Sequence, residues 1–340
     1  MRYGFWMPVF GGWLRNVSDE GMSASWDAMK KLSLAAEDWG YDLTLIAELM
    51  LNDIKGIHSP ALDAWSLAAA LASVTQSLEL LVAVRPTYHA PGPFAKQVAL
   101  IDQISGGRLS LNVVASWWKD EARRFGIPFD EHDDRYARTT EWLQILDRAF
   151  REGVVSFQGR SYQIEELIVE PKPVQKPRPK IYAGGESEAA KQMIARYADV
   201  YVMHGDPPER LLPKIQDMKR RREALELPPL EFGVAAYSIV RETEAAVQRE
   251  IARITDVSPG SSGYANYQDF VQHSQLDQNL SLEDYSVSNR GLKSGLWGTS
   301  SQVIDRIGAF ADVGINLFLL QSSPQYEEMQ RFSEEVMQKL

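Results

Sequence analysis

LELLVAVRPTYHAPGPFAKQVALIDQISGGRLSLNVV, residues 78–114, reads as one complete strand–helix–strand unit. Apolar runs at 78–84 and 109–114 predict two buried strands. The segment between them repeats apolar residues at helical spacing. It ends at Gly106-Gly107, where glycine easily adopts the left-handed conformation that closes helices. The apolar face of this helix consists of Phe94, Val98, Ile101 and Ile104.

The same alternation of strand-like and helix-like segments runs through the whole chain. Parallel sheets covered by helices follow from such alternation, and eight units predict a closed (β/α)8 TIM barrel, an α/β fold. The 340 residues exceed the ~250 that a plain barrel needs, so we expect one domain, 1–340, with insertions after the fourth and seventh strand units. The eight apolar runs are Tyr3–Pro8, Leu43–Ala47, Leu78–Val84, Leu109–Val114, Lys180–Gly184, Val200–Met203, Phe232–Val240 and Leu317–Gln321.

Two segments account for the extra length. Residues 151–179 predict a hairpin-like insertion that turns at Gly159-Arg160 and continues into a proline-rich connector. Residues 256–298 are long, polar and rich in turn formers. Because a long polar loop within a barrel usually has a functional role, we expect a mobile lid over the active site there.

The composition restricts the classes of function. The chain has no cysteine, which excludes disulfides and thiolate chemistry, and its net charge of -10 argues against nucleic acid as the main partner. No apolar run approaches the ~18 residues of a membrane helix, and no export leader is recognisable at the start. We therefore expect a cytoplasmic enzyme that acts on a small molecule.

The run Gly184-Gly185-Glu186-Ser187 follows the fifth predicted strand and precedes a helix. Glycines allow a ligand to approach the backbone, and a helix N-terminus presents N–H groups that suit a phosphate. The hydroxyl of Ser187 adds a further donor. The same residues also fit an ordinary strand-to-helix turn with a serine cap, and spacing alone leaves both interpretations open.

Polar residues also follow other strands. Asn112 interrupts an apolar strand and is expected to form a hydrogen bond, while Ser116, Trp117 and Trp118 lie just past its end. Adjacent tryptophans suit a flat heterocycle, although core packing explains them equally well. His204 directly follows the sixth strand and is a candidate for the cavity, or else a buried hydrogen-bonded residue.

Other chemistries find no support in the sequence. In Glu131–Tyr136, the carboxylates at +1 and +2 from His132 do not share its helical face, and the chain has no His-x-x-x-His pair, so we expect no metal site. That run also fits a solvated helix start. Neither a Gly-x-Ser-x-Gly elbow nor a Gly-x-Gly-x-x-Gly dinucleotide motif is present.

Taken together, the motifs resemble those of the bacterial-luciferase-like flavin monooxygenases, and within them the alkanesulfonate monooxygenase branch. The resemblance covers nearly the whole chain, and dimethylsulfone and pyrimidine-ring-opening monooxygenases look similar too. The motifs that carry it are Leu81–Pro86, Gln97 with Ile101-Asp102, Ser105–Arg108, Leu111–Val114, Asp134–Tyr136, Pro171-Lys172-Pro173 and Tyr182–Ala190.

The resemblance implies a two-component enzyme of sulfur metabolism. A separate NAD(P)H-dependent flavin reductase would supply FMNH2, which would react with O2 to a peroxy- or hydroperoxyflavin. The substrate would be an organosulfonate, cleaved at its C–S bond to sulfite and an aldehyde or carbonyl compound. A neutral sulfone or a nitrogen heterocycle is the alternative substrate. A non-catalytic flavin-binding barrel or a deazaflavin-dependent dehydrogenase is the alternative class. Relatives of this kind imply a homodimer or homotetramer.

The resemblance also implies the site residues. The expected FMN contacts are Glu48 and Leu49 near the isoalloxazine, Asn112 and Ser116, then Glu121, Arg135 and Tyr136, and a phosphate cradle of Gly185, Glu186 and Ser187. The expected catalytic residues are His204, Tyr237 and Arg290, the last on the lid and swinging toward the substrate or flavin.

Two departures from the alkanesulfonate pattern bear on the substrate. An Arg-x-His pair on the seventh strand is replaced by Ala235-Ala236-Tyr237, and a tryptophan after the sixth strand is replaced by His204. A sulfonate needs a compensating cation, usually a guanidinium. Either another cation takes this role or the substrate is not a plain sulfonate, for example a sulfonated sugar. The candidate cations are Arg85, Lys55, Arg290 and Lys293.

Overall fold

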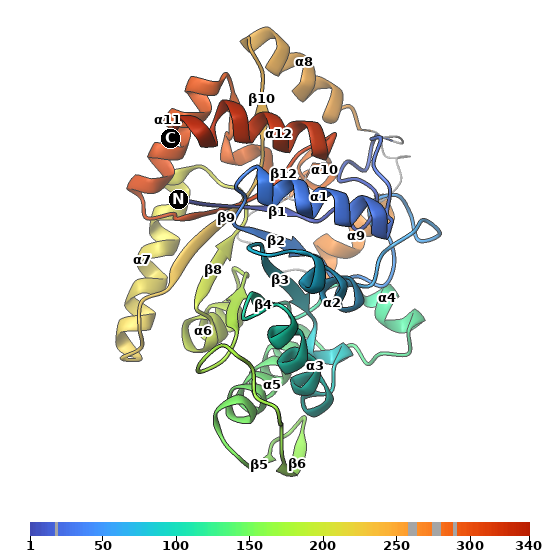
Figure 1. The fold of residues 1–340 in the computed structure, drawn as a ribbon, viewed down its shortest axis with the longest axis vertical. Helices are drawn as coiled ribbons and strands as arrows, with labels where there is room; N and C mark the ends of the chain where they lie inside the picture. Colours follow the sequence, from blue (N-terminus) through green and yellow to red (C-terminus); the bar gives the residue numbers. More distant parts are fainter. Residues whose placement is uncertain (18–19, 258–263, 274–279, 288–290) are drawn as a thin grey trace.

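The computed structural model describes residues 1–17, 20–257, 264–273, 280–287 and 291–340. Its centre is a closed barrel of parallel strands in the order β1-β12-β9-β8-β7-β4-β3-β2, surrounded by helices (Figure 1). This confirms the predicted (β/α)8 barrel. The barrel strands are β1 Arg2–Trp6, β2 Leu43–Ile46, β3 Glu79–Val84, β4 Leu109–Val113, β7 Lys180–Ala183, β8 Val200–Met203, β9 Glu231–Tyr237 and β12 Leu317–Gln321.

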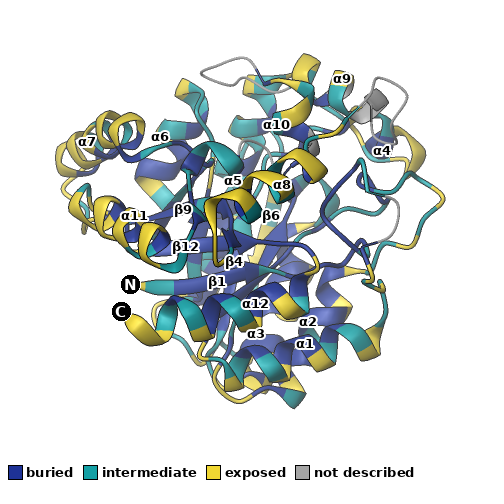
Figure 2. Ribbon diagram, turned by 90° about the horizontal axis from the view of Figure 1, so that it is seen from above, coloured by how far each residue is buried: buried dark blue, intermediate teal, exposed yellow. Residues whose placement is uncertain are grey.

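The helices form the outer layer, and their exposed residues face away from the buried strands (Figure 2). They are α1 Trp26–Asp38, α2 Ala64–Val74, α3 Pro91–Ile104, α4 Lys119–Arg124, α5 His132–Arg151, α6 Glu188–Tyr197, α7 Pro208–Ala224, α8 Glu244–Ile254, α9 Tyr264–His273, α10 Leu282–Ser286, α11 Ser300–Asp312 and α12 Gln325–Glu335. Short 3-10 turns cover Pro86–Tyr88, Gly291–Ser294 and Met337–Lys339.

The barrel interior is filled by side chains from alternate strand positions, which makes it a packed core and directs ligands to one end. Leucines, a valine and a tyrosine form this inner cluster: Leu43, Leu45, Leu81, Tyr182, Val200, Leu317 and Leu319. Opposite side chains of the same strands pack under the helices in a second, larger cluster. Each strand is therefore apolar on both faces, which explains the continuous apolar runs in the sequence.

The segments beyond the barrel have their own regular structure. Strands β5 (Val155–Gln158) and β6 (Gln163–Leu167) form an antiparallel hairpin within residues 151–179. The run 232–240, predicted as one strand, is two. β9 ends at Tyr237, and β10 (Ile239–Val240) leaves the barrel to pair with β11 (Trp297–Gly298).

The segment 256–298 is not a plain loop. Its described parts contain α9, α10, a 3-10 turn and β11. Helix α10 begins at a capping box, in which the Ser281 hydroxyl accepts from the Asp284 backbone N–H at 3.1 Å. Polar residues in this segment therefore mark a helix start that composition alone does not distinguish from a loop. Across the described ranges, no helix combines the length and apolar character needed to cross a membrane.

Candidate active site

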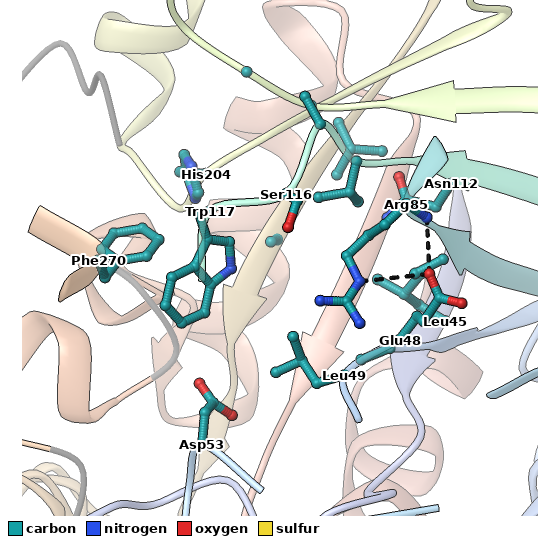
Figure 3. A pocket seen from close by; sticks show the side chains of 18 of the residues that line it. Leu45, Glu48, Leu49, Asp53, Arg85, Asn112, Ser116, Trp117, His204 and Phe270 are labelled. Carbon is teal, nitrogen blue, oxygen red and sulfur yellow. Dashed lines mark hydrogen bonds and ion pairs between the residues drawn. The ribbon is translucent and has the colours of Figure 1, made fainter. Parts of the chain in front are cut away.

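A cavity of about 330 Å³ opens where the barrel strands end (Figure 3). Its walls come from the ends of barrel strands and the loops after β1, β2, β3, β4, β7 and β8, and from α5, α9, β9 and β12. Five aromatic residues line it, Trp6, Phe10, Trp13, Trp117 and Phe270, together with charged and polar groups. This is the end of a barrel at which enzyme active sites lie.

The structure brings most of the predicted site residues to this one cavity. Its walls include Glu48, Leu49, Asn112, Ser116, Arg135, Tyr136, Gly185, Glu186 and His204. Glu121 and Ser187 stand behind the wall and contact residues that line it. Arg290 lies outside the described residues.

In the turn from β7 into α6, the backbone at Gly185 lies close to neighbouring side chains. Gly185 has φ +150°, and a Cβ on it would lie 2.6 Å from the Cβ of Ala190 and 3.1 Å from the hydroxyl oxygen of Tyr136. Ser187 caps α6, because its hydroxyl accepts from the Ala190 N–H at 3.2 Å, and it also bonds the Tyr136 hydroxyl. The serine-cap interpretation is thus correct, and the cradle interpretation remains compatible with it.

Two cations near the cavity, Lys214 and Arg135, differ in whether a carboxylate pairs with them. Lys214 of α7 pairs with Glu186 at 2.9 Å and with Asp206 at 3.1 Å. Arg135 donates through Nη1 to the Asp130 carbonyl at 2.9 Å, and no described carboxylate forms an ion pair with it. Burial lowers the pKa of Arg135, and the neighbouring Tyr136 and Glu131 raise it in part. The cavity wall therefore keeps one positive charge that no described carboxylate pairs.

Arg85, directly after β3, is the most enclosed cation on the cavity wall, with 2% of its side chain exposed. Nη1 pairs with Glu121, Nε lies 3.5 Å from Glu48 Oε2, and the guanidinium lies 3.8 Å from the ring centre of Tyr88. Burial lowers the pKa of Arg85, but the two carboxylates outweigh it and raise that pKa above its usual value. Arg85 is therefore permanently charged.

Besides its ion pair with Arg85, Glu121 accepts hydrogen bonds from two other segments. It accepts from the Met50 N–H at 2.5 Å and from the Tyr88 hydroxyl at 3.0 Å. Glu48 accepts from the Arg85 backbone N–H at 2.8 Å and pairs with the His89 ring. Both carboxylates are buried, so they fix Arg85 and the loop after β2 rigidly against the cavity.

The segment after β4 contributes one polar and one aromatic group. Ser116 has φ +64°, an uncommon conformation for a residue with a side chain, and its buried hydroxyl has no hydrogen-bond partner among the described residues. Trp117 packs edge-on against Phe270 of α9, with ring centres 5.2 Å apart. Trp118 stacks behind Trp117 and is fully buried, so only one tryptophan of the pair forms the wall.

Two further charged residues on the wall were not anticipated. Arg15 pairs with Asp53 and donates to the Tyr285 carbonyl of α10 at 2.9 Å, with its guanidinium 4.0 Å from the Tyr285 ring centre. Asp53 belongs to a polar loop visible in the sequence, but nothing local marks Arg15. The pairing joins loops that follow two different strands.

Tyr237 lies apart from the cavity. It is 1% exposed and packs with Leu14, Ile239, Ile254 and Val287 beneath the loop after β1. Burial raises the pKa of its phenol well above the usual value. A direct catalytic contact, as predicted from the sequence, gains no support from this position.

Of the other candidate cations, the two that the structure describes are paired. Lys55 forms an ion pair with Glu20 at 2.7 Å, and Lys293 forms one with Asp284 at the same distance. Ala235, which replaces the expected arginine, lines the cavity. In the part of the chain that the structure describes, no cluster of three or more His, Asp or Glu side chains could hold a metal ion.

Comparisons with known proteins agree with this geometry. A family model described as luciferase-like monooxygenase matches residues 1–317. An FMNH(2)-dependent dimethylsulfone monooxygenase of Pseudomonas putida is 30% identical over 99% of this chain and 94% of its own length. The enzyme of that name from Pseudomonas fluorescens (strain Pf0-1) is 29% identical over 99% and 93%. These relatives carry a sulfone in their names, not the alkanesulfonate that the sequence motifs suggested.

Solved structures show the same fold. The chain superposes on riboflavin lyase with a TM-score of 0.85 and 18% identity, covering 100% of this chain and 91% of that one. EDTA monooxygenase from Chelativorans sp. BNC1 gives a TM-score of 0.83 and 17% identity, covering 100% and 93%. At these identities the likeness concerns the fold alone.

Proposed function

Because the chain belongs to the luciferase-like monooxygenase family, we propose that it uses reduced FMN and O2 to oxygenate a small neutral organosulfur compound. A sulfone is the first candidate substrate, since relatives that match 99% of the chain are named dimethylsulfone monooxygenases. The protein would be the oxygenase component of a pair, with a separate NAD(P)H-dependent flavin reductase as its partner. A cytoplasmic homodimer or homotetramer remains the prediction for its location and assembly.

The residues at the glycine turn fit the phosphate end of FMN. Only glycine leaves room at position 185, and Arg135 supplies a positive charge that no described carboxylate neutralises. The Tyr136 hydroxyl adds a polar contact at the same place. Bound reduced FMN supplies the electrons that activate O2. The aromatic wall of Trp117 and Phe270 would exclude water from the reacting atoms.

The proposal of a neutral substrate rests on the ion pairs that the candidate cations form with carboxylates. Arg85, Lys55 and Lys293 are each held by a described carboxylate, and Ala235 cannot provide a charge. With Arg135 assigned to the FMN phosphate, a sulfonate would lose its hydration without a compensating cation among these candidates. Burial of an uncompensated charge is costly, whereas a sulfone needs only hydrogen-bond donors.

An organosulfonate, including a sulfonated sugar, is the second candidate. One observation favours it: His204 lines the cavity, and its ring can donate a hydrogen bond to a sulfonate oxygen or a sugar hydroxyl. A His204→Ala variant that keeps wild-type KM and kcat would remove that support.

The proposal is tested by turnover in a coupled assay. The protein is mixed with FMN, NADH and a flavin reductase, and dimethylsulfone consumption is followed by proton NMR. We expect consumption only when reductase and O2 are both present. Sulfite released from methanesulfonate without consumption of dimethylsulfone would instead establish the second candidate. Failure to consume either compound would refute both.

A further inference from the structure

Several buried hydrogen-bond donors on the cavity wall have no hydrogen-bond partner among the described residues, including Trp6 Nε1, Arg85 Nη2 and the Ser116 hydroxyl. We propose that Arg85 Nη2 and the Ser116 hydroxyl, the donor pair, hold an uncharged oxygen acceptor of the bound ligand. Both atoms are buried and have no hydrogen-bond partner among the described residues. Leaving a buried donor unsatisfied is unfavourable, so such atoms usually have a partner in the working state. The inference rests on the proposed function and specifies how that site recognises its ligand.

The arginine is held so that one edge of its guanidinium stays open. Nη1 is bound to Glu121, and Nε lies against Glu48. Nη2 is left on the remaining edge of a planar group that cannot turn without breaking these contacts. In Figure 3 the guanidinium lies between Glu48 and Trp117, above Leu49.

Ser116 approaches the same space from the neighbouring strand. β3 and β4 are paired in register, Val84 with Val113, and the Val114 N–H donates to the Val84 carbonyl at 2.9 Å. Arg85 and Ser116 therefore follow adjacent strand ends. The positive φ of Ser116 is unfavourable for a residue with a Cβ. In Figure 3 its hydroxyl points toward the space that the guanidinium also faces.

The surrounding charge decides which acceptor fits. One guanidinium is matched by the two buried carboxylates of Glu48 and Glu121, so these three groups carry no net positive charge. A sulfonate would gain hydrogen bonds here but no net attraction, and it would face two carboxylates across a low-dielectric wall. An uncharged oxygen gains the hydrogen bonds without that repulsion. The donor pair therefore selects a neutral acceptor.

Two ligands at this site carry such an oxygen. A sulfone offers sulfonyl oxygens and no donor, and the flavin ring offers carbonyl oxygens. Both kinds of oxygen accept the same hydrogen bonds from the donor pair. Measurements of flavin affinity and of sulfone affinity distinguish a flavin carbonyl from a sulfonyl oxygen.

Two substitutions test the donor pair. Ser116→Ala removes one hydroxyl, and Arg85→Lys keeps the charge that Glu48 and Glu121 require while removing Nη2. For each variant, the Kd of FMN is measured by fluorescence quenching and the KM of dimethylsulfone at saturating flavin. We expect either the FMN Kd or the dimethylsulfone KM to rise. The rise should be about 3- to 10-fold for Ser116→Ala and about 10- to 100-fold for Arg85→Lys. A rise in Kd identifies a flavin carbonyl as the acceptor, and a rise in KM alone identifies the sulfone.

Thermal unfolding separates recognition from a structural role. Because Ser116→Ala removes an unsatisfied buried group, its Tm should stay equal or rise. The matched control is Ser333→Ala, since that buried hydroxyl on α12 donates to the Trp39 carbonyl at 2.8 Å and lies off the cavity wall. Its Tm should fall, while its FMN Kd and sulfone KM stay unchanged.

The outcomes separate this inference from the proposed function. Unchanged Kd and KM in both cavity variants would overturn the donor pair, even if the wild-type protein consumes dimethylsulfone. If the wild-type protein consumes no sulfone, the proposed substrate is wrong, and the FMN Kd of the two variants alone decides the donor pair. A lowered Tm of Ser116→Ala with unchanged affinities would assign the hydroxyl a structural role.

Discussion

Replacing Gly185 by alanine tests whether the turn between β7 and α6 holds the flavin phosphate. The new Cβ would lie 2.6 Å from the Ala190 Cβ and 3.1 Å from the Tyr136 hydroxyl oxygen. Overpacking of this kind costs about 1–3 kcal/mol. The φ of +150° adds a strain of about 1–3 kcal/mol for alanine. Relaxation of the turn would move the backbone N–H groups that we propose for binding the flavin phosphate.

We therefore expect Gly185→Ala to lower the Tm by about 5 °C or more and to weaken FMN binding about thirtyfold. Fluorescence quenching of FMN and a thermal melt give both values. Gly126→Ala is the control for backbone strain alone, because Gly126 has φ +68° and a Cβ added there would meet no neighbouring atom within 4 Å. It should lose stability but keep its FMN affinity. Wild-type FMN affinity in Gly185→Ala would refute the assignment of the turn.

Three further substitutions probe other parts of the account. Although burial raises the pKa of Glu37, hydrogen bonds from backbone N–H groups of residues 76–78 lower it below the usual 4.5. The wild type should thus have a larger free energy of unfolding than Glu37→Gln, with the full difference above about pH 4.5. That difference should shrink as the pH falls through the lowered pKa. A difference in guanidinium unfolding that does not change with pH would contradict this. Tyr237→Phe removes a buried hydroxyl with no partner among the described residues and should keep the Tm and FMN Kd; a tenfold loss of turnover in folded protein would restore its catalytic role. Trp117→Ala opens the wall against Phe270 and should raise the Kd of FMN or the KM of the sulfone about tenfold, and two unchanged values would show that this wall contacts neither ligand.

The barrel could be predicted because its strands are buried on both faces and are bounded by turn residues. Val200–Met203 and Leu317–Gln321 match the structure at both ends. The prediction of one strand over 232–240 was wrong, because apolar residues continue through the point where β10 leaves to pair with β11. Nothing in the local sequence reports that change of partner.

The site was predictable only where its chemistry is local. Gly185 and Ser187 are neighbours at a strand-to-helix turn that the sequence indicates, and the structure places them together. The contacts of Arg85 with Glu121 and Glu48 join three separate segments, so no spacing in the sequence reveals them. The positive φ of Ser116 is likewise a consequence of the folded chain.

The surroundings of Tyr237 could not be predicted from the resemblance. A resemblance places it on the strand that carries substrate-binding residues in related enzymes, and Ala235 of that strand does line the cavity. Tyr237, two residues further on, packs instead in the apolar cluster around Leu14, although its register partner Gln321 on β12 does line the cavity. Alternation along a strand assigns Ala235 and Tyr237 to the same face, so it does not predict that only Ala235 lines the cavity.

The central claim is that this cavity takes an uncharged organosulfur substrate. The most direct test compares kcat/KM for dimethylsulfone with that for methanesulfonate, a charged molecule of similar size, in the same reductase-coupled assay. The pairing of Arg85, Lys55 and Lys293 with carboxylates predicts a preference for the sulfone of about a hundredfold or more. An equal or greater kcat/KM for methanesulfonate would contradict the account.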